Sequence, residues 1–181
     1  MIPEIGHILL ILTFVTSILQ VLFWCFNIKK SDDITINVLV KSTFINFVFI
    51  LFSFGILVYS FIISDFSLVI VSDNSHTLKP LIYKISGTWG NHEGSLMLWI
   101  LILSFFTFLV SRKKHQISYK LLSSIIGIQT IILCLFLSFI LFTSNPFERL
   151  NVLPIDGNGL NPLLQDPGLA LHPPLLYFGY V

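Results

Sequence analysis

The sequence predicts an all-α integral membrane protein: a polytopic bundle of four complete transmembrane helices and the start of a fifth. Three observations support this fold class. The chain of 181 residues is 55% hydrophobic and only 10% charged, and its mean hydropathy is +0.90. Soluble domains carry roughly 25% charged residues, so this composition cannot cover a water-exposed surface. Four long stretches also lack Asp, Glu, Lys and Arg altogether.

Each uncharged stretch is close to the length that a helix needs to cross a membrane. They cover residues 5–28, 42–64, 94–111 and 121–145, and a fifth apolar run occupies residues 173–181. A helix of about 20 residues spans the roughly 30 Å of hydrocarbon in a bilayer. Barrel strands alternate apolar and polar residues, whereas these stretches are apolar throughout. We therefore expect helices, which form a single membrane domain over residues 1–181.

The distribution of cations predicts the orientation of the bundle. The loops that join spans one and two, and spans three and four, carry Lys29, Lys30, Lys41, Arg112, Lys113, Lys114 and Lys120. Loops rich in Lys and Arg stay on the inner side of the membrane. The N-terminus and the loops over residues 65–93 and 146–172 are then outside. The cation clusters fit this topology better than nucleic-acid binding, so we expect membrane lipid and no nucleic acid around the chain.

The first outer loop ends in the motif TWGNHEGS, at residues 88–95. Asn91 is a good N-cap for the third span, and Glu93 would lie at the positive end of its helix dipole. Trp89 is the type of residue that anchors a helix end at the membrane interface. By spacing alone, a well-capped membrane helix explains this motif. Trp89, His92 and Glu93 are therefore only supporting candidates for a functional site.

The second outer loop carries DGNGLNPLLQDPG at residues 156–168, followed by HPPLLY at residues 172–177. Its Gly, Asn, Asp and Pro residues specify turns. Pro173 and Pro174 would begin a helix and hold His172 in an extended conformation before it. A neutral imidazole in such a place is a good ligand for iron or another transition metal. A histidine in a helix-start turn is the plainer interpretation.

Together these segments resemble the N-terminal part of the CcmF family of cytochrome c maturation proteins, the haem lyase component. The motif WGNHEGSLMLW at residues 89–99 resembles the start of that family's third span. The motif LNPLLQDPGLALHPPLLYFGY at residues 160–180 resembles the segment that leads into its fifth. The resemblance implies a haem lyase (cytochrome c synthetase) complex, which takes haem from a haem chaperone and attaches it to apocytochrome c outside the membrane. It also implies haem b in transit, and as partners the remaining part of the haem lyase protein and the other members of the complex.

The resemblance assigns the site residues as well. His172 matches the histidine of the family's HPP motif, which implies that it is an external axial ligand of the haem iron. Supporting roles fall to Trp89, His92, Glu93, Asp166, Pro173 and Pro174. No residue is expected to be catalytic. The family's second external histidine, its tryptophan-rich segment and its two intramembrane histidines would lie beyond Val181, so we do not expect this piece to be active alone.

The amino-acid composition indicates which membrane contains the protein, and it also bears on the alternative function. Abundant Phe and Ile, with Lys in excess of Arg, favour a mitochondrially encoded, split subunit of the inner membrane, with its functional loops on the intermembrane-space side. A bacterial inner membrane with periplasmic loops is the alternative. The competing function is a non-catalytic structural subunit of a respiratory or transport complex. Transporters usually place charged residues at membrane depth, and the four spans contain none.

Overall fold

The computed structural model describes residues 1–30 and 32–181, apart from the side chains of Leu163 and Leu164. Over these residues the chain is helical and forms no strand, only an isolated bridge between Leu68 and Arg149. Four helices are long and apolar enough to cross a membrane: α1 (Ile2–Asn27), α2 (Asp33–Ile62), α5 (His92–Ser111) and α6 (Tyr119–Thr143). The predicted all-α polytopic bundle is confirmed.

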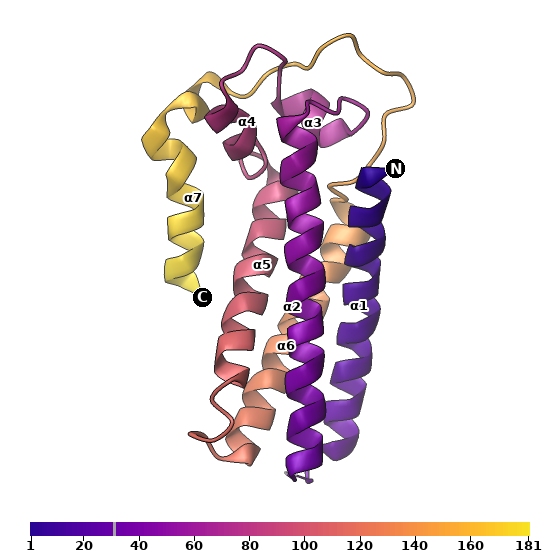
Figure 1. The fold of residues 1–181 in the computed structure, drawn as a ribbon, viewed down its shortest axis with the longest axis vertical. Coiled ribbons are helices and arrows are strands. Elements are labelled where there is room, and N and C mark those ends of the chain that lie inside the picture. The colour runs from indigo at the N-terminus through magenta and orange to yellow at the C-terminus, as the bar shows by residue number, and fades with distance from the viewer. Residues whose placement is uncertain (31) are drawn as a thin grey trace.

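The four long helices form a closed, antiparallel ring. α1 packs against α2 and α6, and α5 packs against the same two helices from the other side. Figure 1 shows them side by side along the long axis, with the N-terminus at the same end as the α2–α5 connection. We call this end, which carries residues 65–93 and 146–172, the loop end. The opposite end carries the seven lysines and arginines that predict the inner side, and we call it the basic end.

The loop end contains helices that hydropathy did not predict. The α2–α5 connection includes α3 (Val69–Asn74) and α4 (Leu81–Gly87), and the segment after α6 includes a 3-10 turn over Pro162–Gln165. The chain then enters α7 (Pro167–Tyr180), which runs alongside α5 and α4 at the edge of the bundle (Figure 1). The fifth helix therefore begins at Pro167, not at residue 173.

α2 also begins earlier than the charge pattern indicates. It starts at Asp33 rather than at residue 42, because Asp32 Oδ1 accepts a hydrogen bond from Thr35 N (3.0 Å) and caps the helix. Lys41 lies within the helix, since a charged side chain marks the edge of the apolar region but does not end an α-helix. The first two turns of α2 thus extend beyond the apolar stretch at the basic end.

A polar network lies inside the bundle between α1 and α2. Asn46 Nδ2 donates to Gln20 Oε1 (2.9 Å), and Gln20 Nε2 donates to Thr43 Oγ1 (3.0 Å). Thr16 Oγ1 donates in turn to Asn46 Oδ1 (2.5 Å). Buried polar groups at membrane depth must find partners within the protein because no water is available there. The network therefore fixes the register of α1 against α2.

The substitution Asn46→Leu tests the contribution of this network. It removes two hydrogen bonds between α1 and α2 and leaves Gln20 Oε1 without its donor. Interhelical hydrogen bonds contribute about 0.6–1.7 kcal/mol each, so we expect the free energy of unfolding in detergent to fall by about 1 kcal/mol. Denaturant titration followed by circular dichroism measures it. Ser124→Ala is the control, because Ser124 Oγ donates within its own helix, to Lys120 O (3.0 Å); equal losses in both variants would contradict the interpretation.

Candidate functional site

The two loops at the loop end contact each other directly. Leu150 N donates to Ser67 O (3.0 Å), and further along the chain Asn158 N donates to Ser72 O (2.7 Å). Arg149, in the second loop, also forms an ion pair with Glu4 at the start of α1. Sequence reasoning treated the loops separately, because nothing local in either one signals the other. The contacts make the loops one layer over the bundle.

Asp156 is the centre of a group of contacts between the loops. Thr77 N (3.0 Å) and Thr77 Oγ1 (2.6 Å) both donate to its carboxylate, and His76 Nε2 lies 3.2 Å from Asp156 Oδ2. The Thr77 hydroxyl is the main reason that the pKa of Asp156 lies below its usual value. Next to it, a Cβ at Gly157 would lie 2.2 Å from Ser75 O, so only glycine fits there. Sequence analysis assigned no role to His76 or Asp156.

The first motif forms the start of α5 as predicted. Asn91 is the N-cap, and its Oδ1 accepts a hydrogen bond from Gly94 N (2.7 Å). Asn91 Nδ2 donates to Gly87 O (2.8 Å), which joins α5 to α4. A Cβ at Gly94 would lie 1.6 Å from Thr88 O, so this close approach requires glycine. The motif is therefore a tight junction between two helices.

His92 and Glu93 lie in the first turn of α5. His92 is exposed, and its ring packs edge-on against Phe139 of α6 with a centroid distance of 6.0 Å. Glu93 is half-buried at the positive end of the helix dipole, where a carboxylate is favoured. Neither side chain donates to or accepts from the second motif among the hydrogen bonds of the described residues.

His172 lies inside α7, which corrects the prediction of an extended conformation before a helix that begins at Pro173. Asp166 is the N-cap: its Oδ1 accepts hydrogen bonds from the two backbone N–H groups that follow Pro167 (2.8 and 3.1 Å). Proline is favoured in the first turn of a helix, so Asp166 and Pro167 form the start signal. Pro173 and Pro174 are interior residues of α7. Asp166 therefore determines where His172 lies on the helix.

Trp89 joins the two motifs through a hydrogen bond that depends on Pro174. In an α-helix the N–H of residue 174 would donate to the carbonyl of Ala170, but proline has no N–H. Trp89 Nε1 donates to this free Ala170 O instead, at 2.8 Å and across 81 positions of sequence. Ala170 is buried, so water cannot readily replace the donor. The contact between the motifs therefore needs both residues: Pro174 leaves the Ala170 carbonyl free, and Trp89 donates a hydrogen bond to it.

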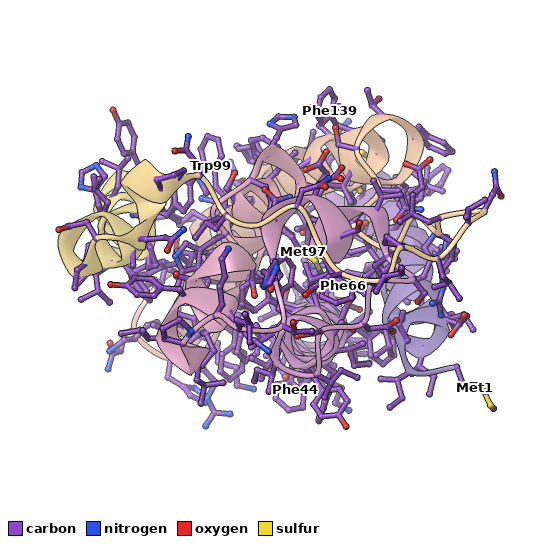
Figure 2. The ribbon with its side chains drawn as sticks, turned by 90° about the horizontal axis from the view of Figure 1, so that it is seen from above. Met1, Phe44, Phe66, Met97, Trp99 and Phe139 are labelled. Carbon is purple, nitrogen blue, oxygen red and sulfur yellow. The ribbon has the colours of Figure 1, made fainter. Side chains whose placement is uncertain are left out.

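A cavity of about 290 Å³ lies where the two motifs meet. Its walls include Trp89, His92, Leu169, Pro173 and Tyr177. Ser86 also lines the cavity, and its Oγ is buried without a hydrogen-bond partner among the described residues. Tyr177 is held in place by Trp99 of α5, whose ring stacks on it at 5.8 Å; Figure 2 shows Trp99 at the side of the bundle next to α7.

The structure brings most of the predicted site residues together around this cavity. Trp89, His92 and Pro173 line it, while Asp166 and Pro174 shape the helix that forms one wall. His172 is exposed on the same helix, outside the cavity walls. No group of three or more His, Cys, Asp or Glu side chains suited to a metal ion occurs in residues 1–30 and 32–181. The described residues therefore place two exposed imidazoles in this region, His92 in the cavity wall and His172 on α7, without a group of three or more metal-ligating side chains.

Comparison with known proteins identifies the family. Residues 89–181, which contain both motifs and the cavity, match the model of the family described as "Cytochrome C assembly protein". The chain belongs to the cytochrome c assembly protein family. Relatives named CcmF confirm the resemblance to CcmF that the two motifs indicated.

Several bacterial cytochrome c-type biogenesis proteins align with the whole chain. It is 45% identical to the cytochrome c-type biogenesis protein CycK of Rhizobium meliloti (strain 1021) over 181 residues. It is 41% identical to CcmF of Escherichia coli (strain K12) over 182 residues. The chain spans only 27% and 28% of the lengths of these relatives. A solved structure titled "Cytochrome c Heme Lyase CcmF" matches 99% of this chain and 28% of its own, with a TM-score of 0.82 and 24% identity, which supports the fold.

Trp89→Phe tests the contact between the two motifs of this cytochrome c assembly protein. The variant keeps an aromatic ring but removes the Nε1–H donor, which leaves a buried carbonyl unpaired. We expect amide hydrogen exchange in α7 to become about tenfold faster, as for the loss of one buried hydrogen bond. Trp99→Phe is the matched control, since it preserves a ring that can stack on Tyr177. The same acceleration in both variants would count against a specific role for the Trp89 hydrogen bond.

Acidification tests the Asp156 contact. A carboxylate whose pKa is lowered by folding stabilises the folded state at pH values above its unfolded pKa of about 3.9. That contribution disappears as the pH falls through the lower folded-state value, when Asp156 becomes protonated. We expect residues 72–77 to become more accessible to proteolysis in acid, and Asp156→Asn to show that accessibility already at neutral pH. Glu148→Gln, at an exposed carboxylate in the same loop, should leave the pH profile unchanged.

Proposed function

We propose that this chain is the part of a cytochrome c haem lyase that receives haem at the outer face of the membrane and helps to attach it to apocytochrome c. The observation that carries this proposal is the exposed imidazole of His172 beside an aromatic-walled cavity. Family membership supports a role in cytochrome c biogenesis. The four helices long and apolar enough to cross a membrane support a location within one. The excess of Lys and Arg at the opposite end supports the loop end as the outer side.

Haem is the cargo of this site, and the residues present suit its chemistry. An imidazole nitrogen ligates haem iron, and the macrocycle favours apolar and aromatic surroundings. His172 supplies the ligand, while Trp89, Pro173 and Tyr177 supply apolar surface on the adjacent wall. The chain offers one external imidazole on this helix, so the second axial position belongs to another segment. We place that segment in the remaining part of the haem lyase protein, since the chain spans about 27% of the length of its relatives.

In this proposal the chain holds the haem and orients it for attachment to apocytochrome c. His172 fixes the iron from one side, and the cap at Asp166 and the bond from Trp89 fix the helix that carries His172. The reactivity belongs to the haem b itself and to the cysteine thiolates of apocytochrome c. His92 acts as a supporting residue in the cavity wall, and Glu93 supports it from the first turn of α5. A haem chaperone delivers the cargo, and other members of the complex complete the site.

We place the protein in the mitochondrial inner membrane, with the loop end toward the intermembrane space. Its Phe- and Ile-rich composition, with Lys in excess of Arg, supports this location. The bacterial inner membrane is the alternative, and the relatives of bacterial origin support it. The geometry of the site is the same in either membrane.

His172→Ala in the assembled complex tests the proposed function. We expect the haem bound at the external site, and the covalent haem on apocytochrome c, to fall at least roughly tenfold, because the imidazole supplies a direct bond to iron. Absorption spectra of the purified complex measure the former, and haem staining of the cytochrome measures the latter. His115→Ala, at an exposed histidine in the α5–α6 connection of the basic end, is the control. If both quantities stay at the wild-type level, the alternative of a structural subunit is favoured.

A further inference from the structure

A groove lies between α2 and α5 on the half of the bundle farthest from the candidate haem site. It has a volume of about 360 Å³, and its lining residues are Val40, Lys41, Phe44, Ile45, Phe108 and Arg112. The rings of Phe44 and Phe108 lie 5.4 Å apart and form its aromatic part. Figure 2 shows Phe44 at the periphery of the helix bundle. We call this feature the α2–α5 groove.

The two cations in the α2–α5 groove have no partner within the described part of the chain. Lys41 and Arg112 are both exposed, and neither side chain takes part in an ion pair or a hydrogen bond there. The only two carboxylates at the basic end have other partners. Asp32 caps α2, and Asp33 accepts hydrogen bonds from Asn37 Nδ2 (2.7 Å) and from a tyrosine hydroxyl of α6 (3.0 Å). The positive charge in the groove is therefore left for a ligand from outside.

These two cations belong to the transmembrane helices and not to the middle of a loop. Lys41 lies within α2, at the boundary of the apolar stretch, and Arg112 is the C-cap residue of α5. The charge pattern of the sequence therefore predicts both at the level where the lipid headgroups meet the hydrocarbon, and both line the groove together with apolar side chains. Another groove, between α5 and α6, is larger, at about 480 Å³, and is lined by His92 and apolar residues with no lysine or arginine. That groove can hold an acyl chain, but it has no lysine or arginine to bind the phosphate of an anionic headgroup.

We propose that the α2–α5 groove binds an anionic phospholipid of the membrane leaflet at the basic end. The phosphate lies between Lys41 and Arg112, and one acyl chain lies along Phe44 and Phe108. Guanidinium and ammonium groups form charge-assisted hydrogen bonds with phosphate oxygens, and the apolar side chains of the groove pack against the acyl chain. The site is separate from the haem site and does not depend on the proposed function.

Lipid titration of the purified complex tests the proposal. We expect phosphatidylglycerol to bind roughly thirtyfold more tightly than phosphatidylcholine of the same chain length, as measured by native mass spectrometry and thermal shift in detergent. The double variant Lys41→Gln/Arg112→Gln should lose this preference. The control Lys29→Gln/Lys30→Gln, which removes two cations from the same end but outside the groove, should retain it. An absent preference in the wild type, or an intact one in the Lys41/Arg112 variant, would overturn the proposal.

Two further measurements separate lipid binding from other causes. Lys41→Arg/Arg112→Lys keeps both charges and should retain the preference, which distinguishes lost binding from a failure to fold. Phe44→Ala should weaken the binding of phosphatidylglycerol while it retains the preference over phosphatidylcholine, because it removes a contact with the acyl chain and leaves both cations in place. If inorganic phosphate stabilises the complex as well as the lipid does, the groove is a phosphate site and the lipid assignment is wrong.

Discussion

The hydrogen bond from Trp89 Nε1 to Ala170 O is the contact on which the candidate site depends. It exists because Pro174 cannot donate to that carbonyl, and a buried carbonyl without a donor is costly. The bond fastens α7 to the junction of α4 and α5, and the cavity between the two motifs has its present walls only while these segments stay together. A proline that would weaken an ordinary helix here provides the acceptor for a contact between distant parts of the chain.

The remainder of the loop end supports that contact. Asp156 and its partners His76 and Thr77 connect the two loops, and close backbone approaches at Gly94 and Gly157 leave little freedom in the segments beside them. Beneath the loops, α1 and α2 of the four-helix ring are held in register by buried side-chain hydrogen bonds, which are favoured because lipid offers no alternative partner. The geometry of the candidate haem site therefore depends on the contacts within the layer of loops, and the helices of the membrane bundle hold that layer in place.

The two ends of the molecule have different chemistry. The loop end combines aromatic residues, prolines and histidines, whereas the basic end combines seven cations with two carboxylates that are already engaged. The same excess of cations that predicts the orientation of the chain also provides the phosphate ligands of the proposed α2–α5 groove. Orientation and lipid binding would thus arise from one property of the sequence, at a distance from the haem site.

The sequence alone determined the four membrane helices, the cap at Asn91 and the family, because hydropathy, capping and motif order are local properties that can be seen along the chain. It also identified Trp89, Asp166, His172 and Pro174 as residues of interest, but it could not state how they act together. Two local start signals for the last helix compete, one at Asp166 and Pro167 and one at Pro173. The tertiary structure favours the first, which moves His172 into the helix. The partners Trp89–Ala170 and His76–Asp156 are 81 and about 80 positions apart, and only folding brings such residues together.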